Sequence, residues 1–138
     1  MIRLRTRVGR AKLAVVASLA LAIMMVGTVL GASYNSTIWY DTTLTGAVRA
    51  YNGPNITISL TSNVDRGGSS QNFHSISLYR QSCILWCGSE RIGTVQVPRV
   101  GASGNRTWTN VGNGNYYFYF FKSFDGVHVW SDNVWMRN

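Results

Sequence analysis

Few side chains in this sequence could perform acid–base or nucleophilic chemistry. From Tyr34 onward the carboxylates are Asp41, Asp65, Glu90, Asp125 and Asp132. A glycosidase needs two carboxylates that face each other across one cleft, and the spacing of these five indicates no such pair. Asp65 and Asp125 stand in turn-like segments, where aspartate is favoured because its side chain hydrogen-bonds the local backbone. We therefore expect the protein not to be an enzyme, and we assign no catalytic residue.

The histidines and the glycine-rich segments form no cofactor motif. His74 alternates with Ile76 and Leu78, which predicts a partly buried structural histidine, whereas His128 is expected to be exposed. Structural zinc needs four good ligands, and here all four would have to come from these histidines and two cysteines. Segments 67–70 and 101–104 lack the lysine and the following helix of a phosphate-binding loop. We expect no metal and no cofactor.

The two cysteines predict a small disulfide ring. Cys83 and Cys87 flank Ile84, Leu85 and Trp86, and in an oxidising compartment such a pair closes by default. A ring this small restrains the unfolded chain by only roughly 2 kcal/mol. Its apolar tip could enter a receptor pocket or a bilayer interface at low entropic cost. In the alternative interpretation, Trp86 folds back and caps the end of the domain.

Aromatic residues near the C-terminus form a second candidate surface. Nine of the seventeen aromatic residues lie between Tyr116 and Trp135. Trp and Tyr on a flat sheet face can stack on sugar rings or fill a protein interface. The predicted ligand-binding residues of this surface are Trp108, Trp130 and Trp135, with Tyr117 and Tyr119 beside Trp130. Ile84, Leu85 and Trp86 of the ring complete the candidate set.

The N-terminal segment has the composition of an export signal. An uncharged apolar stretch of 18 residues, Leu13 to Leu30, follows five basic residues within the first twelve positions. The small residues Gly31, Ala32 and Ser33 come next, as at a signal peptidase site. We expect residues 1–33 to be a signal peptide, a mature N-terminus between Ala32 and Tyr34, and a secreted single domain of residues 34–138. The alternative is a membrane anchor formed by residues 13–30.

The charge distribution argues against nucleic acid as a partner. The chain carries a net charge of +8, but the predicted signal peptide, here called the leader, holds most of that positive charge. The later arginines stand singly rather than in the clusters of a nucleic-acid-binding surface. An extracellular glycan or protein is the expected partner. We expect membrane contact only through the leader or the Cys83–Cys87 ring, and no pattern indicates an oligomeric state.

Alternating apolar and polar residues predict an all-β fold. The clearest run is 55–61, where Ile56, Ile58 and Leu60 alternate with Thr and Ser. Similar runs lie within 44–50, 73–80, 95–97, 107–109, 116–124 and 127–135, separated by Gly, Asn and Pro turn signals. Seven or eight short strands in about 100 residues predict a small antiparallel β-sandwich, Ig-like or jelly-roll-like. A small oligonucleotide/oligosaccharide-binding barrel is the alternative.

Asp125-Gly126 lies between two strand-like runs and predicts a β-hairpin with a type I′ turn. That turn would place Phe121 opposite Trp130, Lys122 opposite Val129, and Tyr117 opposite Val134. The uninterrupted aromatic run 116–121 predicts a central strand with both faces covered. In the alternative, one aromatic face of this strand stays exposed as a binding platform.

Taken together, these features predict a secreted, non-catalytic binding module whose target is a glycan or a protein at the cell envelope. Small size, mild positive charge and tryptophan also suit an antimicrobial or toxin-like protein. A third possibility is an enzyme inhibitor that presents the disulfide ring as a wedge.

Overall fold

The computed structural model describes residues 31–67 and 71–138, so the predicted signal peptide, apart from its last three residues, lies outside the described part of the chain. The described residues form strands and connecting loops, with no helix among them. In chain order the strands are β1 (Ser33–Tyr40), β2 (Thr43–Thr45), β3 (Arg49–Tyr51), β4 (Ile56–Val64), β5 (Phe73–Cys83), β6 (Cys87–Pro98), β7 (Gly101–Ala102), β8 (Arg106–Trp108), β9 (Gly114–Phe121) and β10 (Val129–Arg137).

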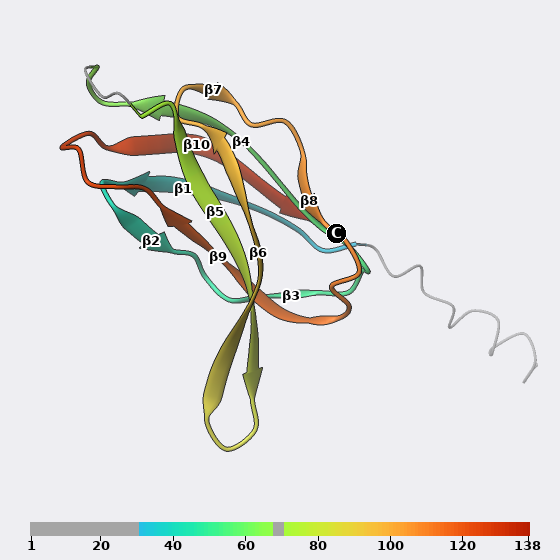
Figure 1. Ribbon diagram of the computed structural model, residues 1–138. Helices are drawn as coiled ribbons and strands as arrows, with labels where there is room; N and C mark the ends of the chain where they lie inside the picture. The colour runs from blue at the N-terminus through green and yellow to red at the C-terminus, as the bar shows by residue number, and fades with distance from the viewer. Residues whose placement is uncertain (1–30, 68–70) are drawn as a thin grey trace, which may run out of the picture. The chain divides into compact units, whose positions relative to one another are not determined.

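The strands build two antiparallel sheets that pack face to face (Figure 1). The first sheet has the order β1-β10-β4-β7, with β8 also paired to β4. The second has the order β2-β9-β5-β6, with β3 also paired to β9. The predicted small antiparallel β-sandwich is therefore confirmed. The described residues form ten strands rather than the predicted seven or eight. The 44–50 segment divides into β2 and β3, and β1 and β7 were not predicted because they carry no clear sequence pattern.

Alternation along the strands creates the core between the sheets. Ile56, Ile58 and Leu60 of β4 point inward, toward a core that includes Leu78 of β5 and Phe118 of β9. All five side chains are almost fully buried. Each contributes on the order of 1.5–3 kcal/mol by leaving water, which is why the intervening Thr and Ser face outward.

The predicted hairpin is wrong, because β9 and β10 lie in different sheets. Segment 122–128 crosses between the sheets and is held there by Asp125, whose carboxylate accepts 2.6 Å hydrogen bonds from Lys122 Nζ and Arg99 Nη1. Gly126 has a φ of +71°, but among the described non-glycine residues only Asn110 has a positive φ. A type I′ turn needs a positive φ at both central positions, so Asp125 does not fit it.

β9 is a central strand of the second sheet, as expected, with different environments on its two faces. Tyr116, Phe118 and Phe120 are buried in the core, whereas Tyr117 and Tyr119 on the opposite face are half-buried. The aromatic run thus follows ordinary strand alternation, and its outer face is only partly covered.

The β5–β6 hairpin is the longest in the fold and extends well past the sandwich (Figure 1). Its ladder runs from Phe73–Pro98 to Cys83–Cys87. Within residues 31–67 and 71–138, no helix has the length and apolarity needed to cross a membrane.

Candidate functional site

A β-bulge interrupts the centre of the first sheet. Between Trp130 and Val134, β10 advances by four residues while its neighbour β4 advances by three, from Asn63 to Leu60. The ladder of β10 with β1 shifts at the same place. Asp132 and its neighbour Asn133 are exposed within this irregular segment. Bulges of this kind commonly re-aim side chains beside functional sites.

Tryptophans stand on both sides of the bulge. Trp39 of β1 and Trp130 of β10 are direct cross-strand partners, and Trp135 follows on the same face. Trp39 is 57% exposed and Trp135 is 49% exposed, which is unusual for side chains of this size. We call Trp39, Trp130, Asp132, Asn133 and Trp135 the tryptophan surface.

The tryptophan surface contains two shallow depressions. One, of about 420 Å³, is lined by Trp39, Trp130, Asp132 and residues 37–38 of β1. The other, of about 460 Å³, lies beside Trp135 and Asn133. Its remaining lining residues are mostly small or polar: Ser59, Leu60, Thr61, Ala102, Gly104 and Asn105. Each depression therefore combines an indole wall with neutral hydrogen-bonding groups, and Asp132 adds a carboxylate to the first.

The ring of Trp39 is supported by a neighbouring side chain. Its ring stacks on His128, with ring centroids 5.1 Å apart and an interplanar angle of 26°. Asp65 in turn accepts hydrogen bonds of 2.9 Å from the backbone N–H of His128 and pairs with its Nδ1 at 2.9 Å. The hydrogen bond from His128 lowers the pKa of Asp65 below its usual range. An ionised Asp65 thus orients the imidazole on which Trp39 rests.

The other sheet carries a separate group of aromatic rings on its outer face. Tyr79 stacks against Tyr117 with centroids 5.2 Å apart and rings nearly parallel, and Tyr119 stacks against Phe121 at 5.7 Å. These four side chains are half-buried, whereas Trp39 and Trp135 are exposed. The prediction that Tyr117 and Tyr119 lie beside Trp130 is wrong. The first two belong to β9 and Trp130 belongs to β10, and these strands lie in opposite sheets.

Trp108 is not part of any exposed surface. Only 7% of it is exposed, and its ring packs against Phe118 at a centroid distance of 5.7 Å. A Cβ at Gly93 would stand 3.1 Å from Nε1 of Trp108, so the glycine makes room for the indole. Trp108 belongs to the core, which corrects its assignment as a ligand-binding residue.

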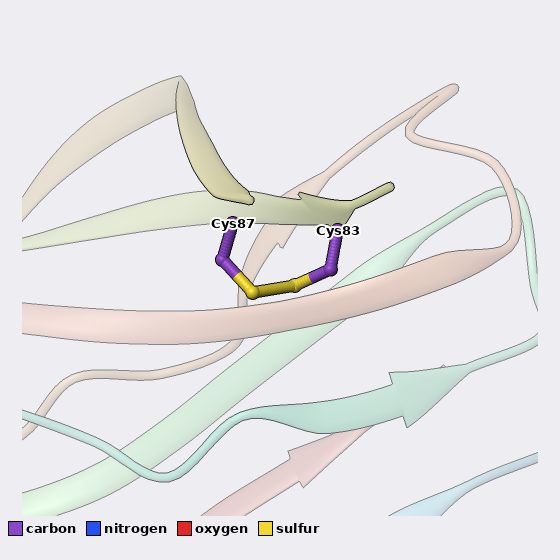
Figure 2. The surroundings of a disulfide bond; sticks show 2 residues. All are labelled: Cys83 and Cys87. Atoms are coloured by element: carbon purple, nitrogen blue, oxygen red, sulfur yellow. A yellow bond between two sulfur atoms is a disulfide. The ribbon is translucent and has the colours of Figure 1, made fainter. Parts of the chain in front are cut away.

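The predicted disulfide is present and closes the far end of the β5–β6 hairpin. Figure 2 shows Cys83 and Cys87 joined through their sulfur atoms at the ends of the two strands. Ile84, Leu85 and Trp86 between them are 95%, 86% and 80% exposed. Trp86 therefore does not cap the sandwich, and the ring displays its apolar side chains to solvent.

His74 lies in a closed polar network between the sheets. Its Nδ1 is 2.5 Å from the hydroxyl of Tyr40, and its Nε2 is 3.0 Å from the hydroxyl of Ser62. Burial, together with the nearby positive charges of Arg99 and Lys122, lowers the pKa of His74 to about 4. Ser62 and His74 are almost completely buried, so a substrate has no access to this pair. The predicted structural role for His74 agrees with this burial.

Among the described residues, no group of three or more His, Cys, Asp or Glu side chains is arranged to hold a metal ion. No protein-family model matches the chain, and a search of curated proteins finds no match. Sequence reasoning identified Trp130 and Trp135 but missed Trp39, Asp132 and Asn133, because β1 and the bulge leave no clear local pattern.

Proposed function

We propose that this protein is an extracellular, non-catalytic module that binds a glycan through the tryptophan surface. The observation that carries the proposal is the bulge of β10, which places exposed Asp132 and Asn133 between Trp130 and Trp135 in the middle of a sheet. Polar groups beside a flat indole are the combination that a sugar ring requires.

The chemistry of the tryptophan surface matches the two kinds of face on a sugar. The C–H face of a pyranose is apolar and stacks on an exposed aromatic ring, while Trp also supplies an N–H for hydrogen bonding. The hydroxyls around the ring need donors and acceptors, which Asp132, Asn133 and Thr61 offer. Two depressions separated along β10 suit two neighbouring sugar units better than a single small molecule.

A glycan fits this surface better than a protein does. Protein interfaces are depleted in Asp and Ser relative to the rest of the surface, whereas Asp132 and Ser59 line the two depressions. Asp132 is also the one carboxylate among those lining residues. Hydrolysis by the usual mechanism needs two carboxylates, which supports binding without catalysis.

The extracellular location belongs to the same proposal. A basic, then apolar, N-terminal segment has the order of an export signal. The Cys83–Cys87 disulfide adds support, since such bonds persist in oxidising compartments.

A glycan panel tests the proposal. We expect the wild-type chain to bind at least one class of envelope polysaccharide, and Trp135→Ala to weaken that binding by about tenfold or more while its thermal unfolding stays close to wild type. Phe124→Ala is the matched control, because Phe124 is an exposed aromatic residue in the crossing segment, outside the residues that define the tryptophan surface. A wild-type chain that binds no glycan, or a loss shared by Phe124→Ala, would contradict the proposal.

A further inference from the structure

The end of the β5–β6 hairpin has the shape and composition of an element that enters an apolar environment. Ile84, Leu85 and Trp86, here called the apolar tip, are the three most exposed large apolar side chains of the described residues. The hairpin holds them beyond the sandwich, away from the core (Figure 1). We propose that the apolar tip inserts into the interface of a lipid bilayer that has anionic headgroups.

The disulfide reduces the cost of such an insertion. Cys83 and Cys87 are bonded to each other, and Ile84 N–H donates to the carbonyl of Trp86 across the turn. The tip is therefore already ordered in the free protein. Binding then loses little conformational freedom, which is the advantage of a preorganised element.

Charge along the hairpin favours an anionic membrane over a neutral one. Residues 82–89 contain no ionisable side chain apart from the bonded cysteines. Arg80, Glu90 and Arg91 come next, and Arg49 lies on the other side of β9 from Arg80, since both pair with Tyr116. Three arginines against one glutamate give the base of the hairpin a positive charge, and each Lys or Arg near such a surface attracts anionic lipid.

Dimensions and backbone chemistry set the depth of insertion. A strand rises about 3.3 Å per residue, so the tip stands about 10 Å or more beyond Arg80. Interfacial elements bury their apolar faces by about 5–10 Å. Arg80 and Arg91 would then lie among the headgroups, and Trp86 at the boundary where tryptophan is enriched. Deeper entry is opposed because the outer edges of a two-stranded hairpin carry unpaired backbone groups.

Depth-dependent fluorescence quenching tests the proposal with the full chain as its host processes it. Vesicles of phosphatidylcholine and phosphatidylglycerol that carry brominated acyl chains should quench wild-type tryptophan fluorescence. Trp86→Phe should remove most of that quenching, whereas Trp39→Phe, which changes the tryptophan surface instead, should retain it. This readout reports the position of Trp86 itself, so any attachment through the N-terminal segment does not imitate it.

Arginine variants and neutral vesicles test whether anionic headgroups contribute to binding. Arg80→Gln combined with Arg91→Gln should weaken binding to the anionic vesicles by about tenfold or more, and pure phosphatidylcholine should bind the wild-type chain weakly. Quenching that persists in Trp86→Phe, equal binding to neutral vesicles, or no vesicle binding by the wild-type chain would each overturn the proposal. Glycan binding should be unchanged in all tip variants, so a negative result for membrane insertion would leave the glycan proposal unaffected.

Discussion

Trp39 and Trp130 face each other across the β1–β10 ladder, and the ring of Trp39 stacks on His128. This pairing joins the first strand of the fold to the last one and connects both to the loop that carries Asp65. Two indoles are thereby fixed on a sheet face, next to a bulge that exposes polar groups. Strand pairing positions both tryptophans, and the crossing segment supports Trp39 through the ring of His128.

Gly126 should be intolerant of a β-branched side chain. Its φ is +71°, and a Cβ placed there would meet no atom within 4 Å. The cost of substitution therefore comes from backbone strain alone, and we expect Gly126→Val to lower the free energy of unfolding by about 1 kcal/mol or more. Gly126→Asn should lose less, since Asn tolerates this conformation. Urea denaturation of both variants measures this difference. Equal stability of Gly126→Val and Gly126→Asn would contradict the explanation by backbone strain.

Asp125 should contribute far more to the stability of the fold than a turn position alone would indicate. Its carboxylate receives 2.6 Å hydrogen bonds from Arg99 and Lys122, whose side chains are nearly fully buried. Removing one partner of a buried ionic group typically costs about 3–5 kcal/mol, so Asp125→Ala should be severely destabilising. Asp132→Ala, an exposed carboxylate in the bulge, should change the free energy of unfolding by no more than about 0.5 kcal/mol. Similar effects of the two substitutions in chemical denaturation would be inconsistent with the buried cluster.

Stability should fall as the pH is lowered toward 4, partly because of His74. Its pKa in the folded protein is about 4, below the value of about 6.5 for an unfolded chain. Between these values the unfolded chain binds a proton that the folded protein excludes, so unfolding is favoured as the pH falls. Above pH 7 His74 is neutral in both states, so its titration no longer changes the free energy of unfolding. From pH 7.5 to 4.5 the loss attributable to His74 is roughly 2–3 kcal/mol.

The comparison for His74 is a variant without the titrating ring. His74→Gln should start less stable at pH 7.5 but show a smaller loss on going to pH 4.5, when both proteins are unfolded with urea. Carboxylates contribute equally to the two proteins, so the difference isolates the imidazole. A parallel pH dependence in both would show that His74 is not excluded from protonation.

The disulfide ring should contribute little to stability. Replacing Cys83 and Cys87 by Ser opens a ring so small that the unfolded chain gains limited freedom, and the expected loss is at most about 2 kcal/mol. Trp86→Ala should change stability by no more than about 0.5 kcal/mol, because the side chain is exposed. A loss of about 3–5 kcal/mol in thermal or chemical denaturation, as for a packed aromatic residue, would mean that Trp86 is buried in solution.

The sequence was informative where local pattern and tertiary environment agree. Ile56, Ile58 and Leu60 alternate cleanly with polar residues, and their strand is found with the predicted faces. β1 was not predicted because its inward positions include Ser36, so its apolar alternation is weak. Trp39 was missed with it.

The predicted hairpin failed for a different reason. Asp125-Gly126 is a strong local signal, but the contact that fixes this segment comes from Arg99, 26 residues away in the chain. That buried ion pair contacts the segment where it crosses from one sheet to the other. No local spacing reveals such a partner, and Trp130 was consequently assigned beside Tyr117 and Tyr119 on the wrong sheet.

The most direct test of the central claim is the affinity of the tryptophan surface for the glycan that the wild-type chain selects, measured by titration calorimetry. We expect Trp39→Ala and Trp135→Ala each to weaken binding by about tenfold or more, which is about 1.4 kcal/mol. Asp132→Asn should weaken it less, and Trp86→Ala should leave it unchanged. Binding that survives loss of both Trp39 and Trp135, or that disappears with Trp86, would place the glycan site elsewhere and contradict the claim.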